Sequence, residues 1–167
     1  MLPKVSIYAV GVGKARSSDG GWGCHINIYD KNINVNGWNH NTTMDDMQLI
    51  SIIKGMEYCK HTKGFTVFIS SPYIKDGLSK LETWKKMNWF SEYGNIKNAN
   101  YWGQIDEISN KYEIKWHFIE NYQDNEMMLL ADKLAFDGLE KAKEHSIFLK
   151  NKRNQKKKPK ILTKRSK

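Results

Sequence analysis

The succession of hydrophobic periodicities along the chain constrains its fold more strongly than any single motif does. Apolar residues alternate with other residues through 22–29 and again through 33–37, on either side of a turn at 30–32. Such alternation is typical of half-buried strands, and the turn predicts that the two strands form a hairpin. An earlier strand is predicted from Val5 to about Gly11. We therefore expect the chain to begin with three consecutive strands.

The spacing of apolar residues then changes to that of a helix. Thr43 can cap a helix over about 44–60, and apolar residues such as Leu49, Ile52 and Met56 fall on one face of it. The remaining elements are a short apolar strand over 65–70, a helix over 72–81, a helix over 101–110, a strand over 112–120 and a last helix over 126–148. An antiparallel meander followed by β–α units predicts an α/β fold, with a mixed five-stranded sheet flanked by helices.

The positive charge is concentrated at one end. Of 27 Lys and Arg residues in the chain, ten lie in 150–167, where there is no acidic residue. The remainder, 1–149, holds 17 basic residues against 18 acidic ones. We predict a folded domain over 1–149 and a disordered basic tail over 150–167, because dense like charge without apolar anchors does not fold. Such a tail is suited to contact the phosphates of nucleic acid.

Composition also bears on location and cofactors. There is no run of about 18 apolar residues that would cross a membrane, and Met1–Ile7 does not resemble a signal peptide. Two cysteines do not make a disulfide framework, so we expect an intracellular protein, cytoplasmic or nucleoid-associated, or nuclear in a eukaryotic cell. No membrane partner is expected. The histidines lack zinc-ligand spacing and no P-loop is present, so no cofactor is predicted.

Several short segments carry a family resemblance by their order and spacing over about 4–140. They are Ile7-Tyr8 with Gly11; Gly20-Gly21-Trp22-Gly23; Thr42-Thr43 with Met47 and Leu49; Tyr73 and Gly77; Trp84-Lys85-Lys86 with Trp89; Ile96-Lys97-Asn98 with Trp102; Ile114-Lys115-Trp116; and Asp132-Lys133-Leu134-Ala135. In this order they resemble the ribonuclease H type 1 family. The resemblance implies a ribonuclease H-like fold and an enzyme that acts on RNA–DNA hybrids.

In that family four carboxylates hold two Mg²⁺ ions. The resemblance places these positions on Val10, Gln48, Ser70 and Asp132, of which only Asp132 is acidic. Mg²⁺ requires hard oxygen ligands and binds poorly to neutral side chains. We therefore expect no intact catalytic set, no bound metal and no enzyme activity. The substitute acids near these positions, Asp45, Asp46, Asp124 and Glu126, do not replace an acid on the first strand.

A second set of residues is expected to bind nucleic acid without cutting it. In the first loop and at the first helix these are Lys14, Arg16 and Thr43, and the basic, tryptophan-rich segment adds stacking and cationic groups. The residues of that segment and of the tail are Trp84, Lys85, Lys86, Trp89, Lys152, Arg153, Lys156, Lys157, Lys158 and Lys160.

Three functions follow from these observations. The first is a non-catalytic nucleic-acid-binding protein, a pseudo-ribonuclease H whose partner is RNA, DNA or their hybrid. The second is a protein-interaction or assembly subunit of a nucleoprotein complex. The third is a residual ribonuclease H with an unusual site, whose cleavage of a hybrid would depend on Asp132. The sequence does not separate the first two functions, and the missing carboxylates disfavour the third.

Overall fold

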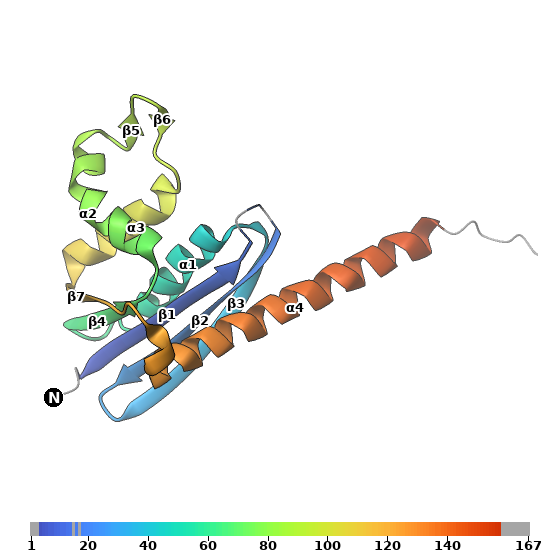
Figure 1. The fold of residues 1–167 in the computed structure, drawn as a ribbon, viewed down its shortest axis with the longest axis horizontal. Helices are drawn as coiled ribbons and strands as arrows, with labels where there is room; N and C mark the ends of the chain where they lie inside the picture. The colour runs from blue at the N-terminus through green and yellow to red at the C-terminus, as the bar shows by residue number, and fades with distance from the viewer. Residues whose placement is uncertain (1–3, 15, 17, 158–167) are drawn as a thin grey trace, which may run out of the picture.

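A five-stranded mixed sheet organises the computed structural model, which describes residues 4–14, 16 and 18–157 (Figure 1). Its strands are β1 (Val5–Gly13), β2 (Ser18–Ile28), β3 (Lys31–Thr42), β4 (Gly64–Ile69) and β7 (Glu113–Phe118). Their order across the sheet is β3-β2-β1-β4-β7. The first three are antiparallel neighbours, whereas β4 pairs in parallel with β1 and with β7. The predicted α/β fold with a mixed five-stranded sheet is confirmed.

The remaining elements complete the chain order. The helices are α1 (Met44–Glu57), α2 (Pro72–Lys86), α3 (Ala99–Lys111) and α4 (Glu126–Lys157), with the short 3₁₀ helix η1 (Tyr122–Asp124) before α4. Between α2 and α3 lies a hairpin that the sequence did not predict, formed by β5 (Phe90–Ser91) and β6 (Gly94–Asn95). No described helix is long and apolar enough to cross a membrane.

Helices cover both faces of the sheet. Alternate residues of β1 point to opposite sides: Ile7 belongs to the main core with Leu49 of α1, whereas Tyr8 packs with Met128 and Ala131 of α4. Helix α4 packs against β1, β2 and β3 and crosses them in Figure 1. The two helices that carry candidate site residues, α1 and α4, therefore lie on opposite faces of the same strands.

Strand β2 begins at Ser18, four residues before the alternating segment that the sequence predicts from residue 22. The reason is close packing of α4. A Cβ atom added to Gly21 would lie 2.1 Å from the Ala135 carbonyl oxygen, and one added to Gly23 would lie 2.5 Å from the Ala131 carbonyl oxygen. Glycine is needed here so that a helix backbone can approach the strand, and not to form a flexible loop.

Helix α1 begins as predicted. Thr43 is its N-cap: the Asp46 backbone N–H donates to Thr43 Oγ1 at 3.2 Å, and the Thr43 backbone N–H donates to Asp46 Oδ2 at 3.1 Å. This reciprocal pair satisfies donors that the first turn would otherwise leave free. The helix ends at Glu57, slightly before the predicted 60.

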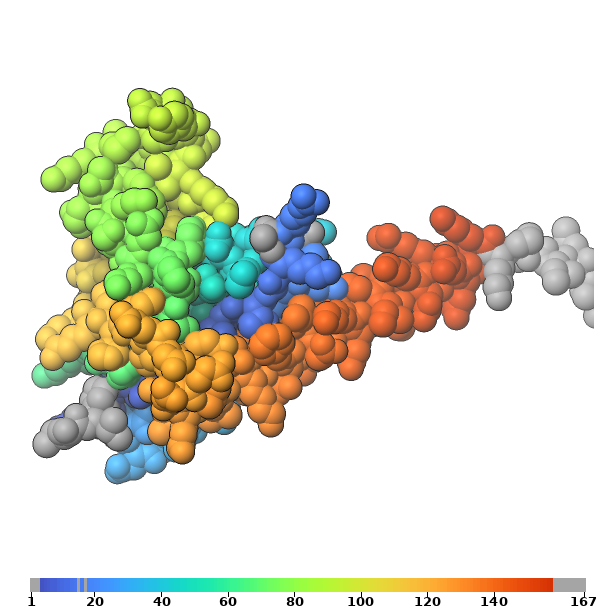
Figure 2. Space-filling model, in the orientation of Figure 1, coloured from blue at the N-terminus to red at the C-terminus, as the bar shows by residue number. Residues whose placement is uncertain are grey.

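Helix α4 continues to Lys157, past the predicted end at Phe148. Residues 150–157, where the sequence predicts an irregular tail, are helical and exposed. Lys, Arg and Gln are good helix formers, so they extend a helix that the sheet has already nucleated. This part of α4 projects away from the sheet in Figure 2. Residues 158–167 lie outside the described residues, and the division at 149 stays a prediction.

Candidate active site

One pocket collects the four positions that the family resemblance assigns to catalysis. Val10, Gln48, Ser70 and Asp132 all line a cavity of about 280 Å³. They come from β1, α1, the residue after β4, and α4. Because β1 and β4 are parallel, their carboxyl ends meet at the same edge of the sheet, which is where α/β folds place ligands. The sequence separates these residues widely, but the fold brings them together.

Two polar side chains of the pocket are bonded to each other. Ser71 Oγ donates to Gln48 Oε1 at 2.7 Å. Ser71 is also the N-cap of α2, since its Oγ accepts from the Ile74 backbone N–H at 3.3 Å. With its carbonyl oxygen engaged, Gln48 keeps an amide NH₂ group that is a donor for a ligand oxygen.

Asp132 is the acidic group in the pocket lining. It is half-buried on α4, and burial raises the pKa of its carboxyl above the usual range. Desolvation disfavours the charged form of a carboxylate, so its proton affinity is increased. A carboxyl group in a pocket with such a shift is suited to accept or hold a proton during a reaction.

Three of the four substitute acids named from the sequence, Asp45, Asp46 and Asp124, are engaged elsewhere. Asp45 Oδ2 lies 2.8 Å from Lys97 Nζ, and Asp46 belongs to the α1 capping box. Asp124 accepts a hydrogen bond from the Asn121 side chain at 3.0 Å. None of these three lines the pocket.

The donor set of the pocket does not fit a pair of magnesium ions. It offers the carboxylate of Asp132, the amide of Gln48 and the hydroxyls of Ser70 and Ser71, whereas two divalent cations need several anionic oxygens. Within 4–14, 16 and 18–157, no three His, Cys, Asp or Glu side chains are grouped so that they could hold a metal ion. The chemistry that this pocket offers is therefore that of its own side chains.

The pocket continues into a groove that the sequence reading missed. A second cavity of about 420 Å³ shares Val12, Met44 and Phe136 with the first, and Lys14 and Lys143 are in its lining. Met44 is 38% exposed and Phe136 is 49% exposed. Phe136 lies one helical turn after Asp132, so the i, i+4 spacing on the predicted helix was the available signal.

The first-loop cations lie near this groove. Lys14 and Arg16 are exposed, and the carbonyl oxygen of Lys14 accepts from the Met44 backbone N–H at 3.2 Å. That bond attaches the loop to the start of α1, close to Thr43. The fold thus brings Lys14 to the groove, whereas Arg16 is not among its lining residues.

The tryptophan-rich segment is largely structural. The ring of Trp84 is tilted by 59° relative to that of Trp102, with ring centroids 5.5 Å apart. The ring centroid of Trp89 lies 6.4 Å from that of Trp84. Both are half-buried against the main core. Lys85 Nζ lies 3.2 Å from Asp106 Oδ1, a contact that raises the pKa of the lysine, and Lys86 is exposed. Of this segment, Lys86 remains the best placed to contact a phosphate.

The cations predicted in the tail are divided by the structure. Lys152, Arg153, Lys156 and Lys157 are exposed along the last turns of α4. They lie far along the helix from Asp132. Lys158 and Lys160 lie outside the described residues.

The chain was compared with known proteins. The sequence model of the RNase H family matches residues 3–140. The chain belongs to the ribonuclease H family. A protein named Ribonuclease H from Acetivibrio thermocellus is 32% identical over 143 residues, which are 84% of this chain and 97% of that protein. One from Bradyrhizobium diazoefficiens, with the same name, is 28% identical over 144 residues, covering 85% of this chain and 94% of the relative.

A solved structure shows the same fold. The crystal structure of LC9-RNase H1, described as a type 1 RNase H with the type 2 active-site motif, superposes with a TM-score of 0.73 at 21% identity. The match covers 85% of this chain and 74% of that one. The ribonuclease H-like fold inferred from the sequence is thereby confirmed.

These relatives overturn one expectation. The sequence reading favoured a non-catalytic protein, a pseudoenzyme, because three of the four assigned positions are not acidic. Ribonuclease H is the name of an enzyme, and proteins of that name align along most of this chain. The prediction was wrong because it gave the four positions more weight than a resemblance that extends over most of the chain.

Proposed function

We propose that this protein is a ribonuclease H that hydrolyses the RNA strand of RNA–DNA hybrids in the groove at Asp132. The observation that carries the proposal is the half-buried carboxyl of Asp132, with its raised pKa, in the pocket where β1 and β4 end. The similarity to proteins named Ribonuclease H supports the reaction class. An intracellular location is part of the proposal.

The phosphate of the substrate is held by neutral donors. Helix α2 starts at the pocket with Ser71 as its N-cap and Pro72 in its first turn, and it has no acidic residue there. The N-terminus of a helix carries partial positive charge and free backbone N–H groups, which favour an anion. The amide NH₂ of Gln48 adds a further donor beside it.

Asp132 acts as the general base. Its carboxylate accepts a proton from the water molecule that attacks the phosphorus atom, and its raised pKa makes it a stronger base than an exposed aspartate. As the new P–O bond forms, the ester bond between phosphorus and the leaving nucleotide oxygen breaks, and that oxygen takes up a proton from solvent water. The half-buried position also limits competition by bulk water. Lys14 and Lys143, beside the groove, neutralise flanking phosphates.

The basic end of α4 contributes affinity. Lys152, Arg153, Lys156 and Lys157 present four exposed cations on one rigid helix. Contacts of this kind are made with the phosphate backbone, so they are insensitive to sequence and weaken with salt.

The test is cleavage of an RNA–DNA hybrid labelled on its RNA strand by the full-length protein, with and without EDTA. We expect cleavage of the RNA, its loss in Asp132→Asn, and its retention in Asp137→Asn. Asp137 is exposed on the same helix and is not among the pocket's lining residues, so it controls for the loss of one carboxylate from α4. The proposal would be overturned if the folded protein left the hybrid intact both with and without divalent ions. It would also be overturned if the two variants cleaved the hybrid equally.

A further inference from the structure

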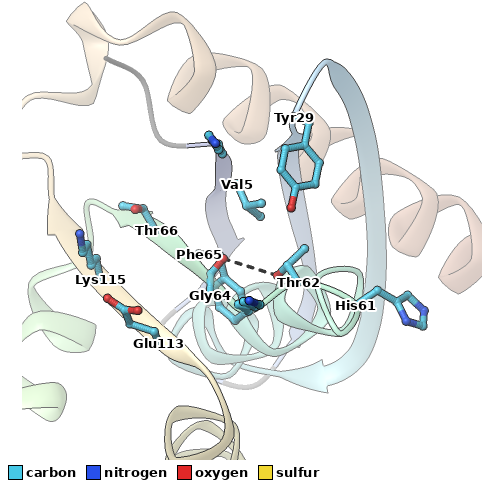
Figure 3. A pocket seen from close by; sticks show the side chains of 11 residues that line it. Val5, Tyr29, His61, Thr62, Gly64, Phe65, Thr66, Glu113 and Lys115 are labelled. Atoms are coloured by element: carbon cyan, nitrogen blue, oxygen red, sulfur yellow. Dashed lines mark hydrogen bonds between the residues drawn. The ribbon is translucent and has the colours of Figure 1, made fainter.

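A further cavity lies at the opposite end of the sheet from Asp132. It has a volume of about 500 Å³ and is formed where β1, β4 and β7 begin (Figure 3). The Asp132 pocket lies instead where β1 and β4 end. The two sites are thus separated by the length of the central strands, and the function proposed above does not use this cavity.

The cavity opens on a part of the sheet beyond the strands that α4 covers. Helix α4 packs against β1, β2 and β3, whereas Thr66 of β4 and Lys115 of β7 are paired neighbours beyond them. Thr66 is half-buried and Lys115 is exposed. Val5 and Phe65, each 5% exposed, contribute apolar lining.

Positive charge dominates its lining. Lys4, Lys63 and Lys115 come from three separate segments, and Glu113 is the one carboxylate among the described lining residues. No ion pair joins any of these lysines to an acidic group within the described part of the chain. Three lysines that line one cavity, and that have no ion-pair partner among the described residues, provide a site for an anion with several negative oxygens.

An exposed aromatic ring stands beside these cations. Tyr29 is 62% exposed, and Figure 3 shows its side chain directed toward the space between Val5 and Thr62. Its backbone has a φ of 54°, in the left-handed region, and its N–H donates to the Lys4 carbonyl oxygen at 2.6 Å. A bulky residue with positive φ is unusual in a turn, and here it holds the ring next to Lys4.

We propose that this cavity binds a nucleoside phosphate, free or at the end of a nucleic-acid strand. The base lies against Tyr29, and the phosphate groups are bound by Lys63, Lys115 and Lys4. Its volume is within the range of about 300–1,000 Å³ typical of small-molecule sites. Stacking on an aromatic ring and charge-assisted bonds to phosphate are the contacts that distinguish a nucleotide from other anions.

The first test measures binding of AMP, ATP and inorganic phosphate to the full-length protein by calorimetry at low salt with EDTA. We expect ATP to bind more tightly than phosphate, and Lys63→Glu/Lys115→Glu to weaken ATP binding by about tenfold or more. The matched control, Lys80→Glu/Lys111→Glu, makes the same change of net charge on exposed faces of α2 and α3. Equal affinity in both double variants, or no binding by the wild type at millimolar ligand, would overturn the proposal.

The second test separates base recognition from charge. Tyr29→Ala is expected to remove the preference for AMP over phosphate while leaving the affinity for phosphate unchanged; an unchanged preference contradicts the role of the ring. Oligonucleotides with and without a terminal phosphate identify the source: tighter binding of the phosphorylated strand than of the same strand without the phosphate assigns a strand end, and equal binding of the two strands assigns a free nucleotide. Asp132→Asn is expected to bind ATP with the affinity of the wild type. The nucleotide-binding proposal and the hydrolytic proposal can therefore be tested separately.

Discussion

The Nε2 atom of His40 and the Nδ1 atom of His145 lie 2.8 Å apart and join strand β3 to helix α4. The other ring nitrogen of His40 lies 2.6 Å from Asp19 Oδ1 on β2, and Ser146 Oγ donates to Asp19 Oδ2 at 2.9 Å. A proton on His40 Nδ1 donates to the carboxylate, which leaves Nε2 as the acceptor for His145. This network attaches the outer half of α4 to the sheet.

Loss of the Asp19 carboxylate is expected to destabilise the protein at neutral pH. Burial alone would raise the pKa of Asp19, but the hydrogen bonds from His40 and Ser146 outweigh it and the pKa is lowered. The stabilisation is therefore fully present above the usual aspartate range and is lost as pH falls through the lowered pKa. Asp19→Asn should lower the free energy of unfolding by about 1–2 kcal/mol at pH 7, measured by urea denaturation.

The same measurement at acid pH provides the control. The wild type loses this contribution as pH falls through the lowered pKa of Asp19, so the difference in unfolding free energy between wild type and Asp19→Asn should shrink toward acid pH. A difference that stays constant from pH 7 to pH 2 would show that the carboxylate's charge has no part in the effect.

Close packing between β2 and α4 predicts a large cost for one added methyl group. A Cβ atom at Gly21 would lie 2.1 Å from the Ala135 carbonyl oxygen, and the backbone there has little room to shift. Gly21→Ala should destabilise by about 3 kcal/mol or more and lower the melting temperature by several degrees. Gly103→Ala is the matched control, because nothing lies within 4 Å of that position on α3.

The control substitution is expected to act in the opposite direction. Gly103 is inside a helix, where alanine is favoured over glycine by about 0.5–1 kcal/mol. Thermal unfolding followed by circular dichroism distinguishes the two. Equal melting temperatures for both variants would contradict the packing argument.

The raised pKa of Asp132 links activity to pH. As a general base it works when deprotonated, so kcat/KM for hybrid cleavage should rise as pH increases through a value above the usual aspartate range. The profile is measured from pH 4 to pH 8 with a short fluorescent hybrid. A profile that is flat across this range would exclude Asp132 as the base.

Although Asp132→Asn should lose activity, we expect it to increase the stability of the protein. A carboxyl whose pKa is raised by folding stabilises the folded state less as pH rises through that pKa. Replacing it by a neutral amide should therefore raise the melting temperature at pH 7. A lower melting temperature would indicate that the carboxylate makes a favourable contact in the folded protein.

The exposed cations at the end of α4 predict the salt dependence of binding. We expect weaker hybrid binding when four of these cations are replaced by Glu, at Lys152, Arg153, Lys156 and Lys157. The slope of log K against log salt concentration should decrease in magnitude by up to about 3–4. Fluorescence anisotropy measures this without cleavage when every protein compared also carries Asp132→Asn. The control reverses Lys54, Lys60, Lys80 and Lys111, which lie on or just after α1, α2 and α3. Equal slopes in the two variants would show that α4 does not contact phosphate.

The sequence predicted the elements well where local pattern decides them. Period-two alternation and the Thr43 cap each follow from neighbouring residues, and both are confirmed. The start of β2 was missed because Gly21 and Gly23 are packed against helix α4, which lies more than 100 residues away in the sequence. Residues 150–157 are helical although charge density indicated disorder, since a preceding stable helix removes the cost of nucleation.

The site was predicted in part. The family resemblance selected Val10, Gln48, Ser70 and Asp132, and the fold places all four in one pocket. The bond between Ser71 and Gln48 spans 23 residues, and the His40–His145 contact spans 105. A local sequence pattern does not predict such contacts, because they depend on how the sheet and the helices pack together.

Helix α4 fixes the distance between the pocket and the basic end of the chain's described part. Asp132 and Lys156 belong to one uninterrupted helix, and at 1.5 Å per residue they are about 36 Å apart along its axis. This is close to the length of one turn of a nucleic-acid duplex, about 34–36 Å. A ligand that touches both ends must be at least that long, so a shorter duplex forgoes one of them.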